Sequence, residues 1–313
     1  MKTFAIADSG AAPTAIEAPV PTLENGQVLV RVLASSVNAT DTGTASGMFA
    51  GFGIPHQYPV TLGRDFAGTV ESVGKGVASL SIGDSVFGEL PFNPPLREGT
   101  WSDYIVSDET TLVRRPGNVD LTTAGAASLA GITGIMTVDA LSLRPGDRVL
   151  VVGATGGVGT VVVQLAAAAG AHILAPALPR DEAFLRGLGV TEILARDADT
   201  VAAVRELHPN GVDAIVDLVS IGAAGAIGVY DQALTVGGRV ASATNAAGEG
   251  PGRTNVNHAP DQEILTRLAD LLSAGTLRIP ISGIFTFTQL PEALNAFQNT
   301  HLQGKIALRR DEH

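Results

Sequence analysis

The 313-residue chain contains no cysteine, which excludes disulfides, thiolate nucleophiles and every zinc site with a cysteine ligand. Charged residues are also few, at 16%, and they sum to a net charge of -11. Nucleic acids and anionic membrane surfaces bind positive patches, so we expect neither as a partner. No apolar run approaches the ~20 residues of a membrane span, and residues 1–8 reach an acidic residue too early for a signal-peptide core. We therefore expect a cytoplasmic protein.

Histidine, the other common metal ligand, is sparse and scattered. None of its positions gives an H-x-x-H or H-E-x-x-H spacing; the six residues are His56, His172, His208, His258, His301 and His313. A histidine outside such a spacing is most often an ordinary surface or hydrogen-bonded side chain. The linear pattern thus predicts no metal site.

Aliphatic residues and glycines are abundant by contrast. Four apolar residues at 149–152 predict a strand buried on both faces, and glycines follow at positions 153, 156, 157 and 159. Residues 158–169 are apolar almost throughout and predict a helix that Gly170 ends. A strand, a G-x-x-G-x-x-G turn and a helix are typical of a Rossmann domain, in which the turn and the helix N-terminus bind the pyrophosphate of a dinucleotide.

The patterns on either side of this turn divide the chain. Residues 1–120 contain short alternating, β-branched segments without intervening helices, which predicts a barrel-like or sandwich domain. The expected strands are 27–37, 65–73, 85–88, 101–107 and 111–114. In residues 121–259, strands and helices alternate, which predicts a doubly wound parallel sheet. The expected helices include 124–129, 132–141, 181–188, 200–207 and 223–234. Residues 260–313 are too few for a third domain, so we expect them to complete the first.

Several motifs, in this order and spacing, resemble those of the zinc-independent branch of the medium-chain dehydrogenase/reductase superfamily, the quinone oxidoreductases and their relatives. They are VNATD at 37–41, LGRDFAGTV at 62–70, VGKGV at 73–77, GDSV at 83–86, GDRV at 146–149, GATGGVG at 153–159, FLRGLG at 184–189, GGRV at 237–240 and GK at 304–305. The resemblance covers nearly the whole chain. It implies an α/β fold in which a doubly wound Rossmann domain, residues 121–259, is inserted in a GroES-like β-rich catalytic domain, residues 1–120 completed by 260–313.

The departures from the superfamily's pattern are also informative. Zinc-dependent members have a cysteine where Asn38 stands, a His-Glu pair where Arg64 and Asp65 stand, and a four-cysteine lobe, none of which is present here. Without a Lewis acid to polarise an alcohol or aldehyde oxygen, alcohol dehydrogenase chemistry is disfavoured. The resemblance therefore implies hydride transfer without a metal.

The cofactor is expected to be NADPH. An NAD site usually ends its second strand with a carboxylate for the ribose 2′-hydroxyl, but no acidic residue occurs here before Asp181. Arg180 stands where family members bind the 2′-phosphate of NADP. The alternative is that Arg180 is a solvated side chain in the first turn of a helix.

Further cofactor contacts are expected from the glycine turn and from residues that follow parallel strands, where open α/β sheets bind ligands. The resemblance adds a threonine near the nicotinamide and a tail lysine that reaches the cleft. Besides Arg180, the expected cofactor-binding residues are Thr133, Gly153, Thr155, Gly156, Gly157, Val158, Gly159, Val219, Ser220, Asn245 and Lys305.

The implied reaction is hydride transfer from NADPH to a small molecule, a quinone or an α,β-unsaturated carbonyl. Many relatives have tyrosines where Gly43 and Phe49 stand, and phenylalanine cannot donate a proton, so an enoyl thioester reductase with a tyrosine acid is disfavoured. Two alternatives stay open: an enoyl thioester reductase of the same superfamily, and a non-catalytic NADPH-binding redox sensor or scaffold.

The candidate substrate-pocket residues are Asn38, Asp41 and Phe49. Asp41 has an alternative role, because its carboxylate can fix its own loop as an Asx-turn. The aromatic residues expected to line an apolar acceptor pocket are Phe49, Phe52, Tyr58 and Phe92. Relatives are usually dimers, so the resemblance implies a homodimer, in which the Rossmann sheet can continue into a partner at a strand near 239–242.

Overall fold

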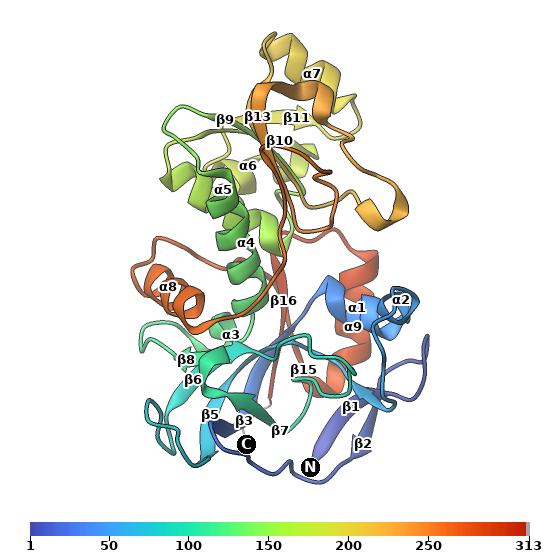
Figure 1. Cartoon of the computed structure of the whole chain (residues 1–313), viewed down its shortest axis with the longest axis vertical. Helices are drawn as coiled ribbons and strands as arrows, with labels where there is room; N and C mark the ends of the chain where they lie inside the picture. Colours follow the sequence, from blue (N-terminus) through green and yellow to red (C-terminus); the bar gives the residue numbers. More distant parts are fainter. Residues whose placement is uncertain (311–313) are drawn as a thin grey trace.

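Two large β-sheets organise residues 1–310, the part of the chain that this computed structural model describes (Figure 1). The lower sheet in the figure has seven strands in the order β15-β16-β3-β5-β6-β8, and β7 also pairs with β3. These strands are β3 (Gln27–Val37), β5 (Asp65–Val73), β6 (Ser85–Glu89), β7 (Tyr104–Asp108), β8 (Leu112–Arg114), β15 (Ile281–Thr286) and β16 (Lys305–Arg309). The tail strand β16 pairs antiparallel with β3, so segments from the first and last parts of the chain share one sheet.

A small sheet and three helices complete this lobe. The sheet has the order β2-β1-β4, and its strands are β1 (Lys2–Ile6), β2 (Thr14–Glu17) and β4 (Val60–Thr61). The helices are α1 (Ala39–Ala45), α2 (Met48–Gly51) and α9 (Leu290–Asn299). The expectation that 1–120 contains no helix is wrong, because α1 and α2 are too short to leave a helical period in the sequence.

The upper sheet is parallel throughout, in the order β11-β10-β9-β12-β13-β14. Its strands are β9 (Arg148–Val152), β10 (His172–Ala177), β11 (Glu192–Ala195), β12 (Val212–Asp217), β13 (Leu234–Ser242) and β14 (Arg253–Asn255). Val149 and Val151 pack into one hydrophobic cluster and Leu150 and Val152 into another, so the continuous apolar run is explained by burial on both faces. The strand order reverses between β9 and β12, and parallel sheets bind ligands at such a reversal.

The remaining helices are α3 (Leu121–Ala124), α4 (Ser128–Leu141), α5 (Gly157–Ala168), α6 (Glu182–Arg186), α7 (Thr200–Leu207) and α8 (Gln262–Ser273). Helix α4 lies where the lobes meet and packs against both α5 and α8 (Figure 1). Glycines permit this approach: a Cβ on Gly131 would lie 2.6 Å from Leu268, and one on Gly134 would lie 2.4 Å from Val161. The buried cluster around α4 also includes Phe87 of the lower sheet, so one core joins the lobes.

Several expected elements differ from the structure. The helix expected at 223–234 is absent, and two short 3-10 turns, Gly222–Ala224 and Asp231–Ala233, stand in its place. Between them Gly225 and Gly228 have φ of 85° and 65°, which a right-handed helix does not contain. The helices expected at 124–129 and 132–141 are a single turn, α3, capped by Asp120, followed by the continuous helix α4.

The free edge of the upper sheet was also placed wrongly. β13, which includes 239–242, is covered by β14, so β14 is the outer strand. A homodimer stays a prediction, and so do the domain boundaries at 120/121 and 259/260. Among residues 1–310 no helix is both long and apolar enough to cross a membrane.

Candidate active site

A cavity of about 770 Å³ lies between the lobes, at the carboxyl ends of the upper strands. This volume is typical of pockets that bind small molecules and cofactors. The lower lobe contributes Val37, Asn38, Ala39, Thr40, Phe49, Ile54, Arg64, Glu89 and Phe92. The upper lobe and the tail contribute the glycine turn with Thr133, Arg196, Thr244, Asn245, His258, His301, Leu302, Gly304 and Lys305, among others.

The glycine turn between β9 and α5 fits a dinucleotide. Gly153 has a φ of 91°, and a Cβ on Gly159 would lie 2.1 Å from the Gly153 carbonyl oxygen, so neither position accepts a larger residue. A Cβ on Gly156 would meet only that same oxygen, at 3.4 Å, which leaves the cavity side open. The first N–H groups of α5 have no partner within the helix and face the place where a pyrophosphate would bind.

The tail of the chain is attached to this turn. Gly304 N–H donates to the Thr155 carbonyl at 2.8 Å, and Gly304 also forms a bridge with Gly156. A Cβ on Gly157 would lie 2.6 Å from Cδ of Lys305, so the lysine side chain passes directly over the turn. The expected proximity of Lys305 to the cofactor cradle thus has a structural basis.

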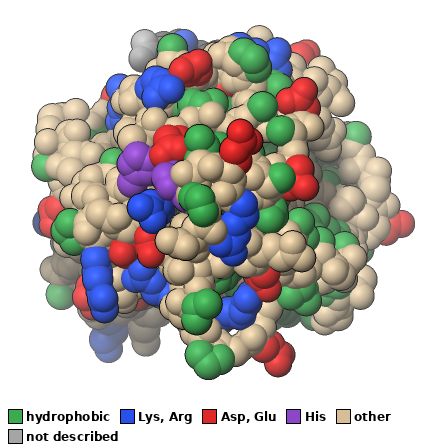
Figure 2. All heavy atoms as spheres, turned by 90° about the horizontal axis from the view of Figure 1, so that it is seen from above, with side chains coloured by type: hydrophobic (Ala, Val, Ile, Leu, Met, Phe, Trp, Pro, Cys, Tyr) green, Lys and Arg blue, Asp and Glu red, His purple; other side chains and the backbone are tan. Residues whose placement is uncertain are grey.

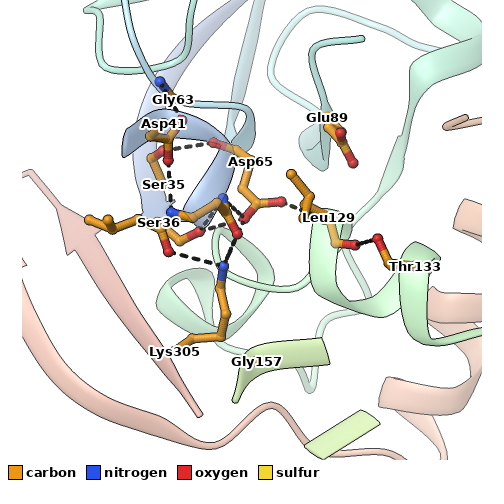
Figure 3. A network of polar contacts seen from close by, with 12 residues as sticks. Ser35, Ser36, Asp41, Gly63, Asp65, Glu89, Leu129, Thr133, Gly157 and Lys305 are labelled. Carbon is orange, nitrogen blue, oxygen red and sulfur yellow. Dashed lines mark hydrogen bonds and ion pairs between the residues drawn. The ribbon is translucent and has the colours of Figure 1, made fainter. Parts of the chain in front are cut away.

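Lys305 ends in a buried polar network (Figure 3). Its ammonium donates to Asn38 Oδ1 and to the Val37 carbonyl, and it lies 3.4 Å from Asp65 Oδ2. Asp65 Oδ2 also accepts from Asn38 Nδ2 at 2.9 Å and from Ser36 Oγ at 2.5 Å, while Oδ1 accepts from the Leu129 N–H at 2.6 Å. Every charge in the network is therefore paired, as burial requires.

This network does not fit a catalytic zinc ion. It occupies the positions where zinc-dependent relatives place their ligands, but it offers an amide and a carboxylate with no thiolate or imidazole. The ammonium of Lys305 already neutralises Asp65, and the buried guanidinium of Arg64 adds a second positive charge nearby. A divalent cation would be repelled by both.

Asp41 lies beneath the cavity and does not line it. Its carboxylate accepts the Asn38 N–H at 2.8 Å, within the capping box of α1, and the Gly63 N–H at 3.0 Å (Figure 3). Burial raises its pKa to about 7 despite these bonds. The geometry favours the alternative role given above, in which Asp41 fixes the loop that carries Asn38.

Phe49 occupies the space that a side chain at position 43 would need. A Cβ on Gly43 would lie 2.8 Å from the Phe49 ring. Phe49 packs edge-on against Phe92 at 4.9 Å between centroids, and the Arg64 guanidinium lies 5.5 Å from the Phe92 centroid. Of the four expected aromatic residues, Phe49 and Phe92 line the cavity, whereas Phe52 is mostly exposed and Tyr58 is bonded to Ser9.

Three further cavity-lining side chains contact one another, and only Thr133 among them was expected. Its hydroxyl lies 2.9 Å from His258 Nδ1, and His258 Nε2 lies 2.9 and 3.0 Å from the two oxygens of Glu89. Burial raises the pKa of Glu89 above its ordinary value. Burial by itself would lower the pKa of His258, but the hydrogen bond and the charge of Glu89 outweigh it, so that pKa is raised.

The hydrogen-bond partners locate the protons of this cluster. Thr133 Oγ1 lies 2.7 Å from the Leu129 carbonyl, which only accepts, so the single hydroxyl proton points there. The hydroxyl oxygen must then accept from His258, which places a proton on Nδ1. A second proton lies between Nε2 and Glu89, because two bare acceptors would repel each other. The pair Glu89–His258 therefore holds two protons and no net charge.

The residues expected around the adenosine end are more dispersed. Arg180 is exposed on a 3-10 turn after β10 and does not line the cavity, whereas Arg196, which follows β11, does. The carboxylate of Asp181 accepts from His301 Nε2 at 2.7 Å and from Gln303 at 2.9 Å. The Asp181 carboxylate is buried, but its hydrogen bonds outweigh burial and lower its pKa. It therefore stays ionised and hydrogen-bonded to His301 and Gln303.

Most of the expected site residues are brought together by the fold. Those that line the cavity are Asn38, Phe49, Thr133, Gly153, Thr155, Gly156, Gly157, Val158, Gly159, Asn245 and Lys305. Those that do not are Asp41, Arg180, Val219 and Ser220. Val219 still borders the turn, since a Cβ on Gly153 would lie 3.0 Å from it. Sequence reasoning missed Glu89, Arg196 and His258.

Comparison with known proteins agrees with this geometry. Residues 24–117 match the family model described as an alcohol dehydrogenase GroES-like domain, and residues 188–308 match the model described as a zinc-binding dehydrogenase. The structure of the quinone oxidoreductase from Coxiella burnetii matches with a TM-score of 0.87 at 25% identity, covering 99% of this chain and 98% of that one.

Two relatives illustrate the range of similar sequences. The NADPH-dependent alkenal/one oxidoreductase of Arabidopsis thaliana is 29% identical over 299 residues, which cover 92% of this chain and 73% of the relative. The phthioceranic/hydroxyphthioceranic acid synthase of Mycobacterium tuberculosis is 31% identical over 305 residues, which cover 90% of this chain but only 14% of the synthase. From its fold, its glycine turn and these matches, the chain belongs to the medium-chain dehydrogenase/reductase superfamily, among the quinone oxidoreductase-like oxidoreductases.

Proposed function

We propose that the protein is an NADPH-dependent, metal-free oxidoreductase that transfers a hydride to a quinone or an α,β-unsaturated carbonyl. The observation that carries the proposal is that one cavity contains both the dinucleotide turn of α5 and the proton-holding pair Glu89–His258. The names of two similar proteins, an alkenal/one oxidoreductase and a quinone oxidoreductase, support these acceptor classes.

The upper lobe binds and orients the cofactor. The N–H groups of the α5 N-terminus bind the pyrophosphate, and Gly156 leaves room for its approach. Thr133 and Lys305 also line the cavity, and Lys305 contacts Asn38 of the lower lobe. The reduced nicotinamide, when bound there, supplies the hydride.

Two arginines favour NADPH over NADH. Arg196 lines the cavity beside β10, since its N–H donates to the Ala177 carbonyl at 3.1 Å, and Arg180 follows the same strand end. Asp181, the one carboxylate near this strand end that an NAD ribose would use, is engaged by His301 and Gln303. A charge-assisted contact to the 2′-phosphate is worth about 1.5–3 kcal/mol.

The lower lobe and the His258 segment provide the proton that reduction of a carbonyl-conjugated acceptor needs. As negative charge develops on the acceptor oxygen, the Thr133 hydroxyl turns from the Leu129 carbonyl and gives its proton to that oxygen. His258 Nδ1 then gives its proton to Thr133 Oγ1, which leaves a neutral imidazole beside an ionised Glu89. The His258 side chain is 25% exposed, so solvent can return the proton.

A quinone depends less on this relay. The reduced quinone anion is a weak base that water can protonate, so it needs positioning more than a general acid. Phe49 and Phe92 supply an apolar wall against which a flat ring can pack.

An enoyl thioester is the second candidate acceptor. It is favoured by the 31% identity to a segment of synthases of phthioceranic acid. The absence of a tyrosine at position 49 counts against it only where a tyrosine is the acid, and the relay through Thr133 provides another proton source.

The proposal is tested by following NADPH oxidation at the nicotinamide absorbance with a quinone, an enone and an enoyl thioester. Turnover with the quinone or the enone is the expected result. Turnover with the thioester alone would identify the second candidate. Tight NADPH binding without turnover on any acceptor would contradict enzymatic function and favour a redox sensor.

The cofactor preference is tested separately. Arg196→Ala and Arg180→Ala are each expected to raise the KM for NADPH by about tenfold or more, with little change for NADH, because only NADPH carries the 2′-phosphate. Glu182→Ala, an exposed residue of α6 that pairs with Arg186, is the matched surface control. Equal effects of the arginine variants on both cofactors would overturn the assignment.

A further inference from the structure

Three side chains converge at the amino ends of the strands of the upper sheet, whereas the cavity lies at their carboxyl ends. His172 is the first residue of β10, Glu192 is the first residue of β11, and His208 follows the last residue of α7. His172 Nε2 and His208 Nε2 both contact Glu192 Oε1, the latter at 3.0 Å. The ligand atoms of all three residues lie within 4.8 Å of one another.

The cluster is accessible without being fully exposed. The exposed fractions of the side chains are 37% for His172, 25% for Glu192 and 16% for His208. The two imidazole rings are nearly perpendicular, with centroids 6.0 Å apart, so their Nε2 atoms converge instead of stacking. Figure 2 looks onto this end of the molecule, and histidine side chains reach the surface there beside acidic ones.

We propose that His172, Glu192 and His208 form a binding site for a divalent transition-metal ion of the zinc class. Two imidazoles and one carboxylate are a donor set that zinc accepts, with water as a fourth ligand. At metal–ligand distances of about 2.0–2.2 Å, tetrahedral ligand atoms are about 3.4 Å apart. Small rotations of the three side chains would bring their ligand atoms to that spacing.

The ion would replace two protons that now hold the cluster together. In the ion-free protein the histidines donate from Nε2 to a single oxygen of Glu192, and hydrogen bonds of this kind outweigh burial and lower the pKa of that carboxyl. Each ring binds a metal once its proton resides on Nδ1. The net charge of -11 favours the approach of a cation.

The position of the site defines its role. None of the three residues lines the cavity, so the ion does not take part in hydride transfer. It would cross-link the starts of two neighbouring strands to the segment between α7 and β12. An ion that binds the folded chain but not the unfolded chain raises the free energy of unfolding. The increase grows with the logarithm of the ratio of the ion concentration to the dissociation constant.

The first test uses the whole protein, freed of metal with a chelator and then titrated with zinc chloride by calorimetry and in thermal unfolding. One equivalent is expected to bind and to raise the Tm by several degrees. Cobalt(II) in place of zinc is expected to give the visible absorption of a four-coordinate ion. Failure of the unmodified protein to bind zinc would overturn the proposal.

The second test assigns the ligands. His208→Gln and Glu192→Gln are each expected to weaken zinc binding by at least about 10–100-fold, since even partners that only orient ligands cost that much. His56→Gln, in the lower lobe, and His258→Gln, in the cavity, are matched controls that keep the affinity. Should His208→Gln fold poorly, Glu192→Gln gives the answer, because it preserves the size of the side chain. Unchanged affinity in either ligand variant contradicts the site.

Discussion

Two clusters built from the same residue types, histidine and glutamate, lie at opposite ends of the upper sheet and differ in burial. Glu89 is 3% exposed, and its two oxygens face one nitrogen of His258. Glu192 is 25% exposed, and one of its oxygens faces two histidines. The pKa of Glu89 is raised because burial dominates, whereas that of Glu192 is lowered because the hydrogen bonds of His172 and His208 outweigh burial.

The difference shows that the degree of burial determines whether a glutamate paired with histidine holds a proton or stays ionised. A deeply buried carboxylate is costly to ionise, so it keeps a proton within the pair and leaves the pair neutral. A partly exposed carboxylate with two donors on one oxygen stays charged and presents its second oxygen, which suits a cation. We therefore expect the first cluster to govern proton transfer and the second to govern only stability and metal binding.

The largest expected effect is on enone reduction. His258→Gln removes the proton held on Nδ1, so kcat with an enone should fall by about 10²-fold or more, the usual contribution of a general acid. The rate with a quinone should change much less. Steady-state kinetics with both acceptors measure this, and His208→Gln, from the other cluster, is the control. Equal losses with quinone and enone would mean that His258 acts on the fold or on cofactor binding.

The relay through Thr133 gives a closely matched pair of variants. Thr133→Val removes the hydroxyl while keeping the shape of the side chain, so the enone rate should fall by about 10²-fold, as in His258→Gln. Thr133→Ser keeps the hydroxyl and should retain most of the activity. A valine variant with normal enone kinetics would show that His258 donates its proton directly. Binding of NADPH, followed by fluorescence, verifies that the cofactor still binds.

The pH profile separates positioning from acid catalysis. Because the pKa of His258 is raised by Glu89, the enone rate should be constant at low pH and fall as pH rises through that pKa. Glu89→Gln removes the charge that raises it, so the fall should begin at lower pH. At a pH between the two falls the variant should be slower than the unmodified protein, and in more acidic solution the two rates should converge. A uniform loss at every pH would leave Glu89 with a structural role only.

The elements predicted correctly from the sequence are those that local residue patterns determine. The turn between β9 and α5 was predictable because its signals are local: a continuous apolar run in the strand, a glycine with positive φ, and a close approach at Gly159. The helix expected at 223–234 was wrong because the prediction followed the apolar content of the segment and gave too little weight to Gly225 and Gly228, which adopt positive φ.

The two histidine clusters could not be identified from the spacing of histidines in the sequence. His258 lies 169 residues from Glu89, and only the packing of the two lobes brings them together. His172 and Glu192 offered a weak signal, because each starts one of two consecutive strands of a parallel sheet and such starts are neighbours. That reasoning did not extend to His208, which is placed by the end of α7.

The smallest expected effect concerns the stability in acid of the partly exposed cluster formed by His172, Glu192 and His208. Since the folded-state pKa of Glu192 is lowered below its ordinary 4.5, its contribution to stability is present above that value and is lost as pH falls through the lowered pKa. With a chelator present, Glu192→Gln should therefore lower the Tm by a few degrees near pH 6, and the difference should vanish in stronger acid. Thermal unfolding monitored by circular dichroism at several pH values measures it. A difference that persists at the lowest pH would reflect packing of the side chain, and the distinction between the two clusters would then rest on burial alone.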